Sequence, residues 1–390
     1  MLSNRVTNLT PSLTFKMVEK VAEMRARGID IISFCVGEPD FETPKFVIEA
    51  AKRAMDEGKT KYTATSGIIP LKQAICDKLK RDNGLTYTPA QIVVSNGGKQ
   101  SLFNTLMSTV NPGDEVIMFA PFWLTYLEQV KLCGGVPVIV NVDEKDDFVP
   151  TAKALRAAIT PKTKIIMLNT PNNPTGAVYS EKQLRELARV IEESNAYLIA
   201  DEIYEKLVYG KTPHWSIANY SKKLYDKTII VNGFSKAFAM TGWRMGYTAS
   251  SPELAAAISG IQSHSTQNVN TITQWAGIEA LNNPQSDATI ADMVRQFKER
   301  REHMRARLTK MPHITCTNPQ GAFYMIIDVR KLGKPALAIA DELLDDYHIA
   351  TTALESFGLP GYIRFSYALG IKEMDEGLDR LEKYLKNVKI

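Results

Sequence analysis

The segment at residues 180–201, SEKQLRELARVIEESNAYLIAD, contains one complete helix-to-strand unit of this 390-residue chain. Ser180 and Gln183 form the pattern of a capping box, in which two side chains bond the first free N–H groups of a helix. Apolar residues then recur at the spacing of a single helix face, at Leu184, Leu187, Ala188 and Ile191. The apolar run at 197–200 predicts a buried strand directly before Asp201.

The same alternation extends in both directions from this unit. Apolar strand candidates lie at 92–95, 115–119, 136–142, 164–168 and 228–231, and helical stretches separate several of them, beginning near Lys99 and Trp123. Continuous apolar strands that alternate with amphipathic helices predict an α/β fold. Its sheet is mostly parallel and is covered by helices on both faces.

The last hundred residues follow a different pattern. We expect helices at 287–308, 335–347 and 372–386 and strands at 321–329 and 362–367, which together suit a smaller α+β domain. The predicted division is a large domain at 45–290 and a small domain built from 1–44 and 291–390, joined through helices rather than a flexible linker. The arginines of the first helix are expected on a solvated face: Arg300, Arg301, Arg305 and Arg307.

Composition narrows the classes of function. The chain has 47 Lys and Arg against 43 Asp and Glu, so its net charge is +4, too small and too dispersed to indicate nucleic-acid binding. No apolar run approaches the length of a membrane span. The four cysteines lie at no metal-ligand spacing, so we expect reduced thiols, no bound metal and a cytoplasmic protein.

A segment rich in small residues lies at 235–244 and reads SKAFAMTGWR. It places Lys236 eight residues before Arg244. A lysine amine with a lowered pKa readily forms a Schiff base, and an arginine is a good fixed partner for a phosphate. This segment can therefore hold both the aldehyde and the phosphate of pyridoxal phosphate. Taken alone, Lys236 can also be read as an exposed loop lysine.

Three further segments agree with that interpretation, and each follows a predicted strand. SNGGKQ at 95–100 offers the N–H groups of a helix start to an anion, although such a turn can be merely tight. NTPNNPTG at 169–176 is a rigid loop where ligands bind in α/β sheets, or a turn in which Asn173 bonds its own backbone. Asp201 ends its strand and needs a cationic partner, unless it caps a helix.

Together these segments resemble the class I aminotransferases of the aspartate aminotransferase family, which have the type I fold of pyridoxal phosphate enzymes. The resemblance spans the chain, from VGEPDF at 36–41 through NNPTG at 172–176 and the Lys236 segment to RFSYA at 364–368. It is strongest to the bacterial aspartate and prephenate aminotransferases.

The resemblance implies the cofactor residues. Lys236 would bind the cofactor aldehyde and carry the proton, Asp201 would pair with the pyridine nitrogen, and Trp123 would stack on the ring. The ring hydroxyl would bond Tyr204 and Asn173. The phosphate would bind the backbone of Gly98 and Lys99 and the side chain of Arg244, while Tyr62 would reach the phosphate bound by a neighbouring subunit, which implies a homodimer.

The resemblance also implies how a substrate is held. Arg364 would bind the α-carboxylate together with the backbone of Gly37, and Trp123 and Asn173 would line the same site. For a dicarboxylic substrate we expect Lys99 to bind the distal carboxylate, assisted by Ser12 and Thr14. Two departures from relatives affect this site: Gly233, where some relatives have a phosphate-binding serine, and the loop at 65–70.

The implied activity is ping-pong transamination, most simply between aspartate and 2-oxoglutarate. Prephenate, aromatic amino acids and alanine stay open as substrates, and a lyase or decarboxylase on the same fold shares the lysine and the aspartate. A regulatory module joined to a DNA-binding domain is the rival from another class. The residues before Gly37 are too few for a winged helix.

Overall fold

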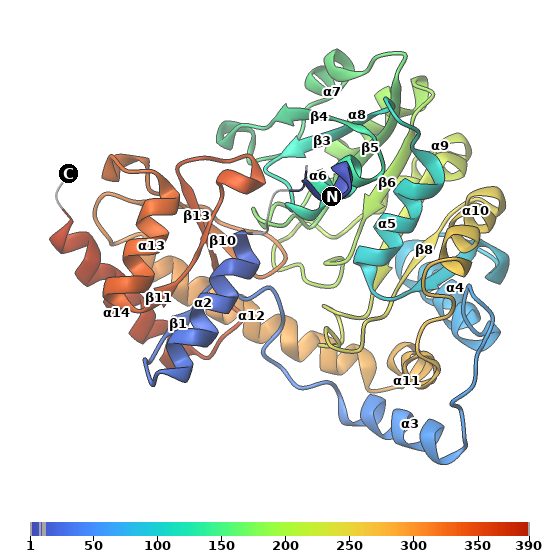
Figure 1. Ribbon diagram of the computed structural model, residues 1–390, viewed down its shortest axis with the longest axis horizontal. Coiled ribbons are helices and arrows are strands. Elements are labelled where there is room, and N and C mark those ends of the chain that lie inside the picture. The colour runs from blue at the N-terminus through green and yellow to red at the C-terminus, as the bar shows by residue number, and fades with distance from the viewer. Residues whose placement is uncertain (1, 8, 10–12, 389–390) are drawn as a thin grey trace.

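The computed structural model describes residues 2–7, 9 and 13–388. Its larger part is built on a seven-stranded sheet of order β2-β8-β7-β6-β5-β3-β4 (Figure 1). Every neighbouring pair is parallel except those made by β8, which is antiparallel to both β2 and β7. The strands are β2 (Ile92–Ser95), β3 (Glu115–Ala120), β4 (Val136–Asn141), β5 (Thr163–Asn169), β6 (Tyr197–Asp201), β7 (Thr228–Gly233) and β8 (Gly246–Ala249).

Helices cover both faces of this sheet, so the predicted α/β architecture is confirmed. Along β3, Val116 and Met118 face a core with α5, α6 and α10, whereas Ile117 and Phe119 face a core with α7, α8 and α9. This alternation is the period-two geometry of a strand buried on both sides. The helices are α3 (Lys45–Asp56), α4 (Ile69–Asn83), α5 (Gly98–Thr109), α6 (Thr125–Leu132), α7 (Ala152–Ala158), α8 (Glu181–Glu193), α9 (Lys222–Lys227), α10 (Pro252–Ser263) and α11 (Thr271–Asn282).

Helix α8 forms with the capping box that its sequence predicts. Ser180 is the N-cap of α8, and its hydroxyl accepts the Gln183 N–H while the Gln183 side chain accepts the Ser180 N–H. The predicted helix near Trp123 begins two residues later, at Thr125. Strand β8 was not predicted from the sequence, because it is only four residues long, includes a glycine and follows the Lys236–Arg244 segment.

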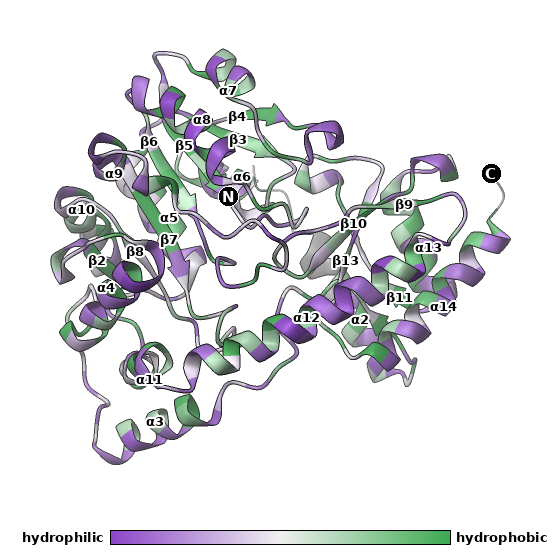
Figure 2. Ribbon diagram, turned by 180° about the vertical axis from the view of Figure 1, so that it is seen from behind, coloured by the Kyte–Doolittle hydropathy of each residue, from purple (hydrophilic) through white to green (hydrophobic). Residues whose placement is uncertain are grey.

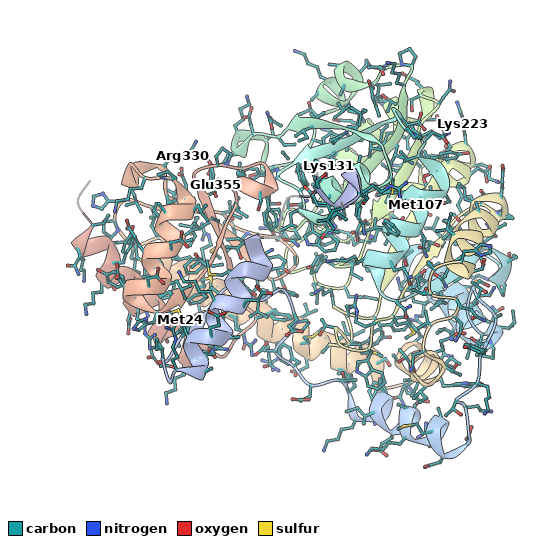
Figure 3. The ribbon with its side chains drawn as sticks, in the orientation of Figure 1. Met24, Met107, Lys131, Lys223, Arg330 and Glu355 are labelled. Atoms are coloured by element: carbon teal, nitrogen blue, oxygen red, sulfur yellow. The ribbon has the colours of Figure 1, made fainter. Side chains whose placement is uncertain are left out.

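The smaller part contains a four-stranded antiparallel sheet of order β12-β13-β10-β9. Its strands are β9 (Thr315–Cys316), β10 (Tyr324–Asp328), β12 (Thr352–Ala353) and β13 (Tyr362–Ser366). A parallel pair joins β1 (Ile32–Ser33) to β11 (Ile349–Ala350), so residues from both ends of the chain share this part. Its helices are α2 (Leu13–Ala26), α13 (Ala336–Tyr347) and α14 (Ile371–Asn387), and Met24 of α2, labelled in Figure 3, is buried. The short helix α1 (Asn4–Thr7) is drawn apart from these, over the larger part (Figure 1).

Helix α12 (Ser286–Leu308) runs from the larger part into the smaller one, as Figure 2 shows from behind. Ile290 belongs to the core under α4 and α11, whereas Phe297 and Met304 belong to the core of the small sheet. A continuous helix therefore links the two parts.

The prediction of solvated arginines on α12 is wrong for two of the four. Arg300 and Arg301 are 9% and 8% exposed. Arg300 donates to Asp40 at 2.6 Å, and Arg301 donates to the carbonyl of Pro319 at 2.9 Å. Their long side chains reach partners brought by distant segments, which helical periodicity cannot reveal.

Within the described residues, every helix is too short or too polar to cross a membrane. The four cysteines are free thiols.

Candidate active site

Asp201 is the last residue of β6 and lies on the face of the sheet that α6 covers. It is 5% exposed and accepts two hydrogen bonds, from Tyr126 OH at 2.6 Å and from the Ile203 N–H at 3.2 Å. Burial raises the pKa of Asp201 to about 6, and these two donors only partly offset it. The carboxyl group is therefore short of positive charge within the chain itself.

Tyr204 follows Asp201 in the turn after β6 and points toward the small sheet. Its hydroxyl lies 3.0 Å from that of Tyr324 at the start of β10. Both rings belong to the core that also contains Phe323. The turn after β6 thus connects the large sheet to the small one.

Lys236 lies in the loop after β7, opposite this turn. Its amine is 5.7 Å from the Tyr204 ring centroid and donates to the Gly37 carbonyl. Burial lowers the pKa of Lys236 to about 8; Arg364 and Arg244 add to this, while Glu38 and Asp201 oppose it. A lysine amine with such a pKa is a competent nucleophile and base near neutral pH.

The start of α5 and Arg244 form one electropositive corner. Gly97 has a φ of +84°, and a Cβ there would lie 2.5 Å from Arg244 Nη2, so only glycine fits beside the guanidinium. A Cβ on Gly246 would come within 2.4 Å of the N atom of Gly98. The helix start offers free N–H groups to an anion, and Arg244 adds a fixed charge.

Arg364 of β13 is buried at 3% exposure and reaches across to the large sheet. It donates to Asn173 Oδ1 at 2.7 Å and to the Cys35 carbonyl at 3.2 Å, and it stacks 4.2 Å from the Tyr324 ring centroid. Its Nε has no hydrogen-bond partner within the described part of the chain. The backbone turn that was an alternative role for Asn173 is made by Asn172, which accepts from Thr175.

Lys99 and Trp123 lie beside the electropositive corner. The Lys99 amine is 5.0 Å from the Trp123 ring centroid, and the Trp123 ring meets that of Tyr126 edge to face at 5.5 Å. Burial lowers the pKa of Lys99, and Arg244 lowers it further. The indole therefore lies between Lys99 and the aromatic partner of Asp201.

The remaining expected residues fall at the edges of this cluster or beyond the described chain. Gly37 contacts the cluster through the Lys236 amine and lies close to the Tyr324 hydroxyl. Tyr62 is 83% exposed and lies outside the core. Ser12 lies outside the described residues, and Thr14 lies in α2, where only its backbone is described.

Two residues of the cluster were missed by sequence reasoning. Tyr126 lies in the first turn of α6, three positions after Trp123, and the helix predicted from about Trp123 would have placed it beside the ring. Tyr324 is a core residue by pattern and carries no local signal, because its contacts with Tyr204 and Arg364 come from distant segments.

The cluster is separate from a cavity of about 430 Å³ between the end of β4 and the small sheet. That cavity is lined in part by Glu144, Arg330 (labelled in Figure 3) and Tyr362, and it contains none of the expected site residues.

The residues present fit a group with an aldehyde, a basic ring nitrogen and a phosphate. Lys236 suits the aldehyde, Asp201 lacks the cation that a protonated ring nitrogen would supply, and Arg244 with the α5 start suits the phosphate. These are the three features of pyridoxal phosphate.

Comparison with known proteins identifies the family. The model of the family "Aminotransferase class I and II" matches residues 29–381, and the chain belongs to this family. It is 42% identical to an aspartate aminotransferase of Bacillus sp. YM-2 over 99% of both chains. It is 41% identical to a probable aspartate/prephenate aminotransferase of Aquifex aeolicus, again over 99% of both.

Solved structures agree with this assignment. Aspartate aminotransferase from Thermus thermophilus with maleate superimposes with a TM-score of 0.95 at 40% identity, covering 98% of this chain and 99% of that one. The enzyme from Rhizobium meliloti gives 0.96 at 36% identity over the full length of both. The protein is therefore an aminotransferase, its family implies pyridoxal phosphate, and a lyase is not favoured.

Proposed function

We propose that this enzyme uses pyridoxal phosphate to transfer the amino group of aspartate to 2-oxoglutarate in two half-reactions. The observation that carries the proposal is the grouping of Lys236, with its pKa near 8, with Asp201 and Arg244 around one corner of the sheet. Relatives at about 40% identity named for aspartate or for aspartate and prephenate support the substrate class.

The bound cofactor would withdraw electrons from the substrate α-carbon, which makes its proton acidic. Asp201 would keep the ring nitrogen protonated, because a buried carboxylate gains a cationic partner there. Tyr204 and Asn173 would bond the ring hydroxyl, and Trp123 would cover the ring face. Gly98, Lys99 and Arg244 would hold the phosphate.

Lys236 would do the proton chemistry. Its amine would accept the proton of the substrate α-carbon and deliver it to the cofactor carbon C4′. Burial lowers the pKa of this amine to about 8 and so favours its neutral form.

Two cations would select a dicarboxylate. Arg364 would bind the α-carboxylate through its unpaired Nε and its planar fork, with the Gly37 backbone beside it. Lys99 would bind the distal carboxylate, and Ser12 and Thr14 would assist from the N-terminal segment. The maleate named in the solved relative is itself a dicarboxylate, which supports this reading.

We further propose that residues 45–290 act as a cofactor domain and that 1–44 with 291–390 act as a small domain that closes over the substrate. The exposure of Tyr62 supports a homodimer in which it reaches a neighbouring site. Four free thiols support a reducing, cytoplasmic location.

A half-reaction tests the function. Protein reconstituted with pyridoxal phosphate is mixed with aspartate alone and followed by absorbance. We expect full conversion to the pyridoxamine form with one equivalent of oxaloacetate, reversed by 2-oxoglutarate. A panel with prephenate, phenylalanine and alanine ranks the substrates, and release of ammonia or carbon dioxide instead would indicate a lyase.

A further inference from the structure

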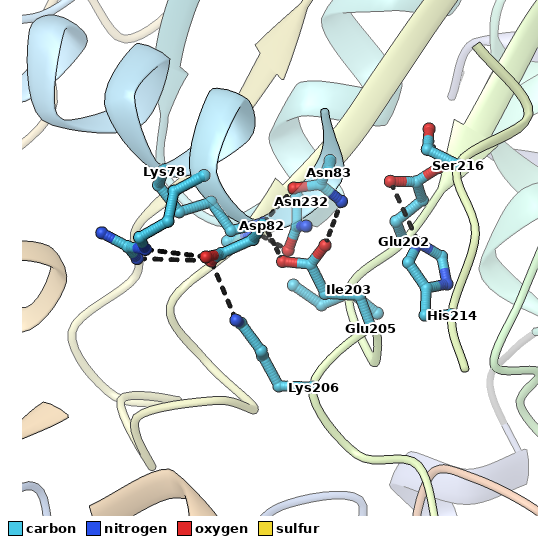
Figure 4. A network of polar contacts seen from close by, with 12 residues as sticks. Lys78, Asp82, Asn83, Glu202, Ile203, Glu205, Lys206, His214, Ser216 and Asn232 are labelled. Atoms are coloured by element: carbon cyan, nitrogen blue, oxygen red, sulfur yellow. Dashed lines mark hydrogen bonds and ion pairs between the residues drawn. The ribbon is translucent and has the colours of Figure 1, made fainter. Parts of the chain in front are cut away.

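A buried polar cluster surrounds the turn that follows β6 (Figure 4). Asp201 and Glu202 are consecutive at the strand end, so their side chains point to opposite sides of the sheet. Glu202 is 2% exposed and accepts from the Ser216 hydroxyl at 2.6 Å. Its other oxygen lies 3.3 Å from Nε2 of His214. None of these side chains belongs to the site described above.

His214 is placed to balance the negative charge of Glu202. Burial lowers the pKa of His214, but Glu202 and then Glu205 raise it more, so that it lies above its ordinary value. The raised pKa favours the charged imidazole, which lies beside a carboxylate that has little access to water. Without that charge, Glu202 would be a buried anion with a single hydroxyl donor, which is costly.

A second ion pair, between Lys78 of α4 and Glu205, anchors the turn after β6 to that helix. Glu205 accepts from the Lys78 amine and from Asn83 Nδ2, the latter at 2.7 Å, and Lys78 also donates to Asn83 Oδ1 at 2.8 Å. Burial alone would raise the pKa of Glu205, but Lys78, His214 and Asn83 lower it to about 2. Next to it, Lys206 pairs with Asp82 at 2.8 Å.

Between these anchors the backbone forms a tight turn. The Glu202 N–H donates to the Val231 carbonyl on β7, and the Glu205 N–H donates to the Glu202 carbonyl, both at 2.9 Å. The Ile203 N–H donates to Asp201 Oδ1. The position of Asp201 and Tyr204, three residues apart, thus depends on where Glu202 and Glu205 are held.

We propose that Glu202, His214 and Ser216, braced by the Lys78–Glu205 pair, form a positioning unit that fixes Asp201 and Tyr204 for cofactor binding. This inference rests on the proposed function of those two residues. The unit touches no reacting atom, so its members are positioning residues and act through the turn.

A metal ion is the alternative occupant of this cluster. Ligand atoms of Glu202, Glu205 and His214 lie within 4.8 Å of one another. Lys78 already neutralises Glu205, however, and His214 already balances Glu202, so a divalent cation would have to displace two positive charges. The charges present favour the positioning unit.

The test measures cofactor affinity as well as turnover. His214→Asn removes the counter-charge, and we expect the Kd of the apo-protein for pyridoxal phosphate to rise about tenfold. We also expect kcat to fall about tenfold, with KM for the amino donor within about twofold. His303→Asn is the matched control, because His303 forms a half-exposed pair with Asp375 at 2.7 Å far from this turn. It should leave all three constants unchanged.

The double variant Glu202→Gln with His214→Gln supplies a neutral hydrogen-bonding pair. We expect it to restore the Kd to within about threefold of the parent, whereas Glu202→Gln and His214→Gln alone should each be worse. Additive effects would overturn the charge-balance assignment. A stoichiometric metal in the purified parent that His214→Asn loses would overturn it as well.

A merely structural role would lower the unfolding temperature of His214→Asn while leaving the Kd and kcat unchanged in the folded protein, which contradicts the proposal. If that variant does not fold, Ser216→Ala removes one hydrogen bond to Glu202 and should raise the Kd about threefold; an unchanged Kd again contradicts it. Asp201→Asn is measured alongside. If it alters cofactor binding and His214→Asn does not, the positioning unit fails and the proposed function stands. If Asp201→Asn has no effect, the proposed function fails.

Discussion

Asp201 and Glu205 are buried acids four residues apart at the end of the same strand, yet their pKa values move in opposite directions, to about 6 and about 2. Asp201 is bonded by a tyrosine hydroxyl and a backbone N–H, so burial dominates. Glu205 has the Lys78 ammonium and the His214 imidazole nearby, so charge dominates. Among the described residues, no cation forms a hydrogen bond or ion pair with the Asp201 carboxylate, whereas the Glu205 carboxylate is neutralised by Lys78.

Within a single turn, Asp201 therefore belongs to the proposed functional site and Glu205 to the stable framework. A buried acid that the chain leaves uncompensated lowers stability, and proteins retain such groups where a ligand uses them. A buried acid with a lysine partner belongs to the framework, and removing either partner exposes the other to the full cost of burial. Paired substitutions on the two sides of the turn test this difference between the two acids.

The largest contrast is expected between two lysines, one on each side. Lys236→Ala should lose the covalent bond to the cofactor and lower kcat by about 10⁴-fold or more, because nucleophile and base are removed together. Since the pKa of Lys236 is already lowered by burial, its removal should leave the free energy of unfolding of the apo-protein nearly unchanged.

Lys78→Ala is the counterpart. It leaves Glu205 as an uncompensated buried anion, so we expect a loss of about 3–5 kcal/mol in the free energy of unfolding from urea denaturation. The folded fraction should retain covalently bound cofactor and measurable turnover. If Lys236→Ala kept near-parent turnover, the assignment of the base would be wrong.

The acids themselves give the next contrast. Asp201→Asn should lower kcat by about 10²–10³-fold through loss of the charge that keeps the ring nitrogen protonated. Glu205→Gln should change kcat by less than about tenfold but destabilise the protein, because Lys78 loses its anion. Steady-state rates and denaturation curves of both variants check this, and equal effects on rate would remove the distinction.

The sequence predicts those features that a local pattern encodes and misses those that depend on contacts between distant residues. The α8 cap, the apolar strands and the Lys236–Arg244 segment carry local patterns, so the α/β fold and the family were predictable. Lys78, His214 and Tyr324 carry none, because their partners come from other parts of the chain. The burial of Arg300 was mispredicted for the same reason: Asp40, its partner, is 260 positions away.

Lys99 tests how the site selects a dicarboxylic substrate. Lys99→Ala should lower kcat/KM for aspartate by about 30-fold, since one charge-assisted bond to the distal carboxylate is lost. Alanine and phenylalanine should change by less than about threefold. Lys223→Ala, on the outer surface in Figure 3, is the control. Equal losses for all three donors would exclude Lys99 from specificity.

The pH dependence of stability gives the smallest effect. For Glu205 the folded pKa lies below its usual 4.5, so its contribution is present above that pH and is lost as the pH falls toward 2. For Asp201 the folded pKa lies above its usual 3.8, so the apo-protein gains stability as the pH falls from above 6 toward 4.

Asp201→Asn should therefore stabilise the apo-protein at pH 7.5 by at most about 3 kcal/mol, and the gain should vanish near pH 4. Urea denaturation of the parent and the variant across this range measures the difference. A gain that persisted at pH 4 would show that its cause is not the Asp201 charge.

The proposed transamination depends most directly on which lysine binds the cofactor. Protein reconstituted with pyridoxal phosphate is reduced with borohydride, digested and mapped by peptide mass spectrometry. We expect one phosphopyridoxyl group per chain, on Lys236. Modification of a different lysine such as Lys99, or a protein that stays colourless and unmodified, would contradict it.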